Sequence, residues 1–129
     1  MSDKTQPTSR TGAIEWHDLT VENAAAIRDF YCSVVGWEAG AVSMGDYDDF
    51  NIKLPDNGET VAGICHARGS NANLPPQWLI YVRVNSVIDS AERCQQLGGS
   101  VLDGPRPMGG SQFCVIRDPE GAVLALLSD

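Results

Sequence analysis

Two short runs of the chain hold most of the side chains that could carry out acid–base chemistry on a small molecule. Residues 14–21 alternate in character, and residues 78–84 form an equivalent run later in the chain. A period of two is typical of a strand that turns one face to a core and the other to something more polar. The side chains of the second face are Trp16, Asp18 and Thr20 in the first run and Leu79, Tyr81 and Arg83 in the second.

This set combines two groups that can exchange a proton with a surface suited to a partly apolar organic molecule. We predict that the Asp18 carboxyl and the Tyr81 phenol act as acid or base. The predicted ligand-binding residues are Trp16, Thr20, Leu79 and Arg83. In the alternative, Trp16 and Leu79 only fill the protein interior, and Asp18 pairs with Arg83.

An internal repeat relates the two runs. A shift of 63 residues places Leu19 on Val82, Asn23 on Ser86 and Gly36 on Gly99. Each run leads into a helix-like segment with a good N-cap residue, and the first of these helices has a glycine directly after its last residue. The repeat predicts two copies of the same β-α-β-β-β module.

The expected elements follow from hydrophobic period and turn residues. In the first module we expect strands at residues 14–21, 37–42, 47–54 and 60–66 and a helix at 23–35, whose apolar face is Ile27, Phe30, Tyr31 and Val34. In the second we expect strands at 78–84, 100–102, 112–117 and 122–127, a helix at 87–97 and a loop at 104–110. Arg106 in that loop is exposed or serves as a mobile lid cation.

Length and charge limit the classes of partner. The 129 residues fit a single domain, with a loose tail at 1–11, module one at 12–66, a linker at 67–76 and module two at 77–129. The formal net charge of −8 disfavours nucleic acid, and the chain holds no apolar run long enough to span a membrane. Four cysteines without a C-x-x-C pair indicate reduced, buried thiols in a cytoplasmic protein.

The ordered motifs of the chain resemble the vicinal oxygen chelate superfamily of glyoxalases, bleomycin-resistance proteins and extradiol dioxygenases. The resemblance rests on the paired modules, on Phe30-Tyr31 followed by Gly36-Trp37, and on the closing Asp118-Pro-Glu-Gly121. The chain is most similar to a bacterial subgroup of glyoxalase-related proteins without an assigned reaction. This resemblance implies an α+β fold in which both modules form one curved mixed sheet around a funnel-shaped cavity.

The resemblance also implies four metal-ligand positions, which fall on Trp16, Leu79, Ala125 and either Cys65 or His66. The first three cannot ligate a metal. His17 shares its strand face with the apolar Leu19 and is expected to be structural, and Trp37 and Trp78 are expected to be packing residues. We therefore expect no catalytic metal and no cofactor.

Three functions stay open, each with a small-molecule ligand. The first is a metal-free protein of unassigned reaction that binds a small organic molecule in the funnel. The second is a metal-dependent lyase, isomerase or dioxygenase with atypical ligands around His17 and His66. The third is a drug-sequestering protein of the bleomycin-resistance type. We expect a homodimer, because many relatives complete their sites with a second chain and because exposed sheet edges favour pairing.

Overall fold

The computed structural model describes residues 10–129 in two compact units, each considered by itself. Most of the predicted loose tail at 1–11 lies outside the described residues. One unit spans Trp16–Leu79, and the other joins Ile80–Asp129 to the N-terminal segment that ends at Glu15. The first unit holds most of predicted module one together with the predicted linker, and the second holds most of predicted module two. We call the two units module one and module two.

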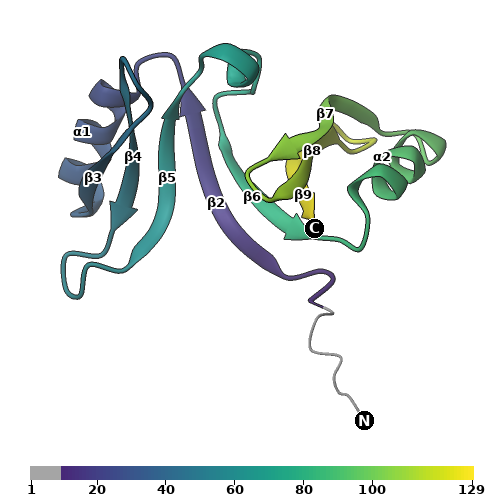
Figure 1. Cartoon of the computed structure of the whole chain (residues 1–129), viewed down its shortest axis with the longest axis horizontal. Helices are drawn as coiled ribbons and strands as arrows, with labels where there is room; N and C mark the ends of the chain where they lie inside the picture. The colour runs from purple at the N-terminus through teal and green to yellow at the C-terminus, as the bar shows by residue number, and fades with distance from the viewer. Residues whose placement is uncertain (1–9) are drawn as a thin grey trace, which may run out of the picture. The chain divides into compact units, whose positions relative to one another are not determined.

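Module one has the predicted β-α-β-β-β order, shown in purple to teal in Figure 1. Its elements are β2 (Ile14–Val21), α1 (Ala24–Val35), β3 (Glu38–Ser43), β4 (Asp48–Lys53) and β5 (Thr60–His66). The strands lie in the order β3-β4-β5-β2, with β2 parallel to β5 and the other pairs antiparallel. The predicted bounds of β2 and β5 are confirmed. The predicted bounds of β3 and β4 differ from the observed ones by one residue at each end, and α1 begins one residue later than predicted.

Helix α1 has the predicted ends. The Asn23 side chain accepts a hydrogen bond from the Ala26 amide at 3.1 Å, and Gly36 adopts φ 89° directly after the last helical residue. The predicted apolar face is only partly correct. Ile27 and Tyr31 pack against the core, whereas Phe30 and Val34 are 54% and 65% exposed.

The core of module one lies between α1 and the sheet, because α1 contacts β3, β4 and β5. Successive side chains of a strand point to opposite faces, so alternate residues of β2, β4 and β5 face this helix. The fully buried members are Leu19, Ala24, Phe50, Ile52, Ala62 and Ile64. The opposite face of the same strands is therefore the more polar one.

Module two repeats this topology (Figure 1). Its elements are β6 (Trp78–Arg83), α2 (Val87–Gln96), β7 (Ser100–Met108), β8 (Ser111–Arg117) and β9 (Val123–Ser128). The strand order is β6-β9-β8-β7, with β6 parallel to β9, so β6 takes the place that β2 has in module one. The α+β class and the paired modules are thus confirmed.

The predicted loop at 104–110 is wrong, because β7 continues to Met108. Gly104 and Pro105 fall in a register shift of the β7–β8 pairing, and Arg106 pairs with Phe113 beyond it. Strand β7 has a neighbour on one side only, and proline is tolerated on such an outer strand or at a bulge. Arg106 is consequently a strand residue and is ion-paired to Asp103 at 2.8 Å rather than placed on a loop.

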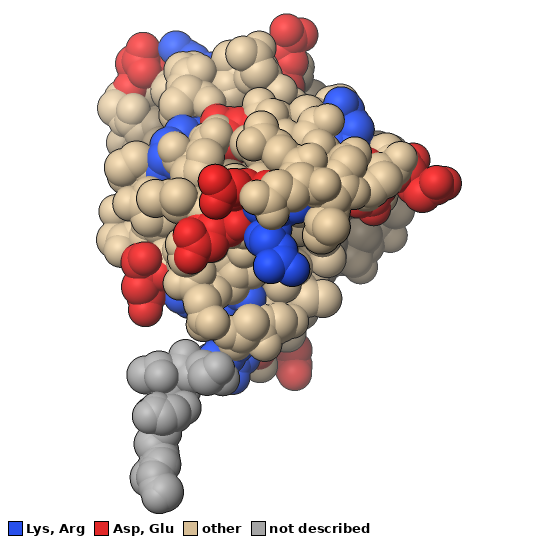
Figure 2. All heavy atoms as spheres, turned by 90° about the vertical axis from the view of Figure 1, so that its right-hand side faces the viewer, with Lys and Arg blue, Asp and Glu red and all other residues tan. Residues whose placement is uncertain are grey.

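Surface features agree in part with the predictions. All four cysteines are free, but only Cys114 is fully buried. On the face shown in Figure 2, basic side chains are interspersed with acidic ones and form no continuous basic patch. None of the helices formed by residues 10–129 is both long and apolar enough to cross a membrane.

Removing a core side chain tests the packing of module one. Ile52 is 0% exposed, so Ile52→Ala should lower the free energy of unfolding by about 2–5 kcal/mol, through lost burial and a residual cavity. The same change at Ile88, which is 63% exposed, should alter it by no more than about 0.5 kcal/mol. Urea unfolding of both variants measures the difference, and equal losses would contradict the described core.

Candidate functional site

Asp18 occupies a recess in the polar face of module one that a single glycine leaves open. The parallel pairing of β2 with β5 sets Asp18 directly opposite Gly63. A Cβ atom at Gly63 would overlap the Asp18 carboxylate, and the Trp16 ring lies close to the same point. Only glycine at this position therefore lets the carboxylate lie against the sheet.

Two donors hold the Asp18 carboxylate in this recess. The Trp16 Nε1–H donates to Oδ1 at 3.3 Å, and the Cys65 Sγ–H donates to Oδ2 at 3.5 Å. Burial raises the pKa of Asp18 from 3.8 to about 6, the two hydrogen bonds oppose this rise, and the charge of Asp49 adds to it. Asp18 can therefore both accept and give up a proton near neutral pH.

Cys65 serves as a hydrogen-bond donor rather than a nucleophile. Burial and the neighbouring Asp18 and Asp49 raise the pKa of its thiol above the ordinary value. A thiol that stays protonated is a weak nucleophile but a suitable hydrogen-bond donor. Thr20, which pairs with Cys65 across the strands, is 2% exposed.

A second polar pair lies beside the recess. Asp49 of β4 is buried and accepts a hydrogen bond from the backbone amide of His66 at 2.8 Å. The ring Nδ1 of His66 lies 3.4 Å from the same carboxylate oxygen. The rings of Tyr47 and Phe50 contact His66, which fixes the imidazole between them.

The predicted residues of module two lie in a different setting. Tyr81 is 3% exposed and stacks on Phe113 at 5.7 Å. The guanidinium of Arg83 forms ion pairs with Glu15 and Asp129, each at 2.9 Å, and the hydrogen bond to Arg83 lowers the pKa of Glu15. The charge of Arg83 is thus already balanced by two carboxylates of its own module.

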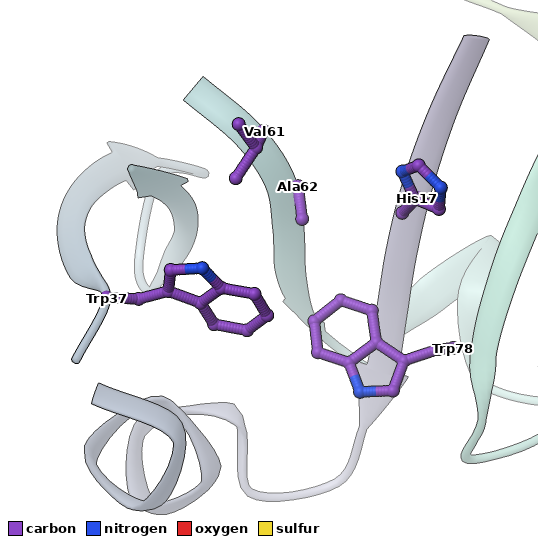
Figure 3. Close-up of a pocket in the computed structure, with 5 residues that line it drawn as sticks. All are labelled: His17, Trp37, Val61, Ala62 and Trp78. Carbon is purple, nitrogen blue, oxygen red and sulfur yellow. The ribbon is translucent and has the colours of Figure 1, made fainter. Parts of the chain in front are cut away.

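A cavity on the helix side of module one was not predicted as a site. It measures about 400 Å³ and is lined by His17, Trp37, Val61, Ala62 and Trp78 (Figure 3). His17 faces away from the recess of Asp18, as predicted, but its side chain is exposed rather than enclosed in the core. Trp37 and Trp78 pack on each other with ring centroids 5.8 Å apart, and they also form part of the cavity wall.

A protein-family model identifies the superfamily of the chain. The model of the Glyoxalase/Bleomycin resistance protein/Dioxygenase superfamily matches residues 13–126. The chain belongs to this superfamily. The match covers both modules, including all of β2 with Asp18 and the first part of β9.

Longer curated proteins are distant relatives of this chain. Anthracycline biosynthesis proteins DauV of Streptomyces sp. (strain C5) and DnrV of Streptomyces peucetius are 29% and 28% identical to it over 131 residues. These alignments cover 89% of this chain but 46% of each relative, so the chain spans about half their length.

Solved structures support the fold assignment. Streptomyces coelicolor methylmalonyl-CoA epimerase, solved as a variant in complex with 2-nitronate-propionyl-CoA, superposes with a TM-score of 0.54. Its sequence is 18% identical, and the superposition covers 92% of this chain and 95% of that one. A likeness at this identity shows the shared superfamily fold.

The residues present do not fit the metal site that the superfamily resemblance implies. The indole of Trp16, the isobutyl group of Leu79 and the methyl group of Ala125 offer no lone pair to a cation. Within residues 10–129 no group of three or more His, Cys, Asp or Glu side chains is placed to hold a metal ion. Cys65, near the fourth position, donates a hydrogen bond from its Sγ–H to Asp18.

The raised pKa of Asp18 predicts a pH-dependent cost of keeping this carboxyl in the folded protein. Because the folded state holds the proton more tightly than the unfolded state, stability is lost as pH rises from about 4 through 6. Asp18→Asn removes this cost. The difference in unfolding free energy between the variant and wild type should therefore shift in favour of the variant by about 1–3 kcal/mol when the pH is raised from 4 to 7.5.

Urea unfolding at the two pH values measures this gain, with Asp48→Asn as the control at an exposed carboxylate of β4. A gain from Asp18→Asn that is the same at pH 4 and pH 7.5 would show that the carboxyl is not desolvated.

Proposed function

We propose that this chain binds a small organic molecule over the polar face of β2 and β5, and that Asp18 exchanges a proton with it without a bound metal ion. The observation that carries this proposal is the Asp18 recess. A partly buried carboxyl with a pKa near 6 is suited to general acid–base catalysis at neutral pH. Hydrogen bonds from Trp16 and Cys65 hold the two oxygens of the Asp18 carboxylate in one orientation.

The surroundings of Asp18 suit a ligand that is neutral or weakly polar at the reacting position. The Trp16 ring beside the carboxylate offers an apolar contact surface, and it also excludes water from the proton-transfer site. Substrates with an acidic C–H next to a carbonyl group match this arrangement, because a carboxylate can remove such a proton and return it. The epimerase among the solved structures acts on methylmalonyl-CoA, an ester of this general class.

The two other functions remain distinguishable from this proposal. A metal-dependent lyase, isomerase or dioxygenase would need ligands other than the side chains at the superfamily positions. A sequestering protein would bind its ligand without any proton exchange. Exchange chemistry, metal dependence and binding are therefore measured separately.

Proton exchange from carbon is the direct test. Wild-type protein incubated in D2O with a panel of acyl thioesters and α-hydroxyketones should catalyse deuterium incorporation at the acidic carbon of at least one compound, followed by proton NMR. Asp18→Asn should lower the rate by about 100-fold to 10,000-fold, because the proton acceptor is lost. EDTA should leave the rate unchanged.

Two glycine-to-alanine variants provide a matched comparison. Gly63→Ala should also lower the rate, because its methyl group displaces the Asp18 carboxylate. Gly40→Ala on β3 should not, because a Cβ there meets only the mobile end of the Lys53 side chain. Exchange lost in EDTA and restored by a divalent metal would favour the metal-dependent reading, and saturable binding without exchange would favour sequestration.

We also propose that the protein is a homodimer. Strands β3 and β7 each have a partner on one side only within their modules, and such edges favour pairing with another chain. Light scattering at tens of micromolar should return about 28 kDa, twice the chain mass of 13.9 kDa. A mass near that of a single chain would contradict the dimer.

A further inference from the structure

The cavity lined by His17, Trp37, Val61, Ala62 and Trp78 lies on the other face of the strands that hold Asp18. His17 and Asp18 are neighbours on β2, and Ala62 and Gly63 are neighbours on β5, so their side chains point to opposite faces. The cavity and the Asp18 recess are thus two separate places on one sheet. The cavity volume of about 400 Å³ is in the range of small-molecule sites.

The aromatic walls of this cavity are held in place before any ligand binds. The Trp78 Nε1–H donates to the Tyr31 hydroxyl at 3.1 Å, and the two rings meet edge to face at 5.4 Å. Tyr31 also contacts Trp37 at 6.0 Å, so one tyrosine of α1 supports both indoles. Figure 3 shows the six-membered rings of Trp37 and Trp78 directed toward each other.

Because the Trp78 N–H is already used, the Trp78 part of this wall presents carbon surface to a ligand. Val61 and Ala62 of β5 add only aliphatic groups. A flat aromatic molecule gains more from two fixed indoles than a flexible aliphatic one does, since ring contacts add to apolar burial and little side-chain entropy is lost.

His17 adds an imidazole to the lining beside the two indoles. Its side chain is exposed, and no side chain or backbone group of residues 10–129 forms a hydrogen bond with its ring. Figure 3 places the ring at the edge of the cavity, across from Trp37. The imidazole can therefore donate to a hydrogen-bond acceptor at one end of a ligand whose rings lie against the tryptophans.

We propose that this cavity is a second binding site, which takes a planar aromatic molecule bearing one acceptor group such as a carboxylate. The rings lie against Trp37 and Trp78, and the acceptor lies on His17. This site is independent of the proton-transfer function proposed for Asp18.

The experiment uses 2-naphthoate as the probe and follows the indole N–H signals of the 129-residue chain by NMR. The expected result is saturable binding that shifts the Trp37 and Trp78 signals and leaves the Trp16 signal, on the other face, in place. Decahydro-2-naphthoate, which has the same carboxylate and no aromatic ring, should bind at least about tenfold more weakly.

Two variants and one control locate the site. Ala62→Leu fills the cavity and should abolish binding, whereas Ala26→Leu, the same change at an exposed position of α1, should not affect it. His17→Ala, at an exposed side chain that folding does not require, should weaken naphthoate binding by about tenfold.

Three results would overturn the proposal. They are the absence of saturable shifts up to the solubility limit of the probe, shifts confined to Trp16, and equal affinity for the aromatic and the saturated acid. Unchanged affinity in His17→Ala would remove the assigned role of the imidazole even if Ala62→Leu failed to fold.

Discussion

The close approach of the Asp18 carboxylate to the α-carbon of Gly63 is the contact on which the site depends. Parallel pairing of β2 and β5 brings these two residues opposite each other, although they are far apart in sequence. Without a side chain on β5, the carboxylate lies against the sheet, out of most solvent, and its pKa rises to about 6. Any side chain at residue 63 would move the carboxylate outward and return it to water.

This arrangement has an energetic cost that the rest of module one must offset. Keeping a carboxylate in a recess opposes folding at neutral pH, and the buried apolar residues on the helix side supply the opposing gain. One strand thus serves both purposes. Leu19 and Val21 of β2 face α1 and stabilise the module, while Trp16 and Asp18 face the opposite side and form the recess.

Much of the fold could be predicted because the relevant signals are local. The alternation of apolar and polar side chains predicted β2. The side chain of Asn23 and the left-handed conformation of Gly36 explain why α1 begins and ends where it does. The continuation of β7 past residue 102 was missed because glycine and proline normally indicate a loop, and nothing local shows that residues 104–108 pair with β8 across a bulge. The exposure of Phe30 was missed because periodicity defines an apolar face but not how much of it is covered.

The candidate site could be predicted only in part, for the same reason. The side-chain alternation of β2 identifies Asp18 and Trp16 as neighbours on one face, and the structure brings them together. The partners Gly63 and Cys65 come from a strand whose register no local pattern reveals. The cavity lined by Trp37 and Trp78 depends on contacts between α1, β5 and these two residues, which are far apart in sequence. His17 was expected in the core because it alternates with leucine and valine along β2.

A measurement of the Asp18 pKa tests the central claim most directly. The carboxyl carbon of Asp18, identified by its absence in Asp18→Asn, can be followed by NMR as a function of pH. A desolvated carboxyl held by Trp16 and Cys65 predicts a midpoint close to 6. A midpoint at or below the ordinary value of 3.8 would show a solvated carboxylate and would contradict both the recess and the proton transfer assigned to it.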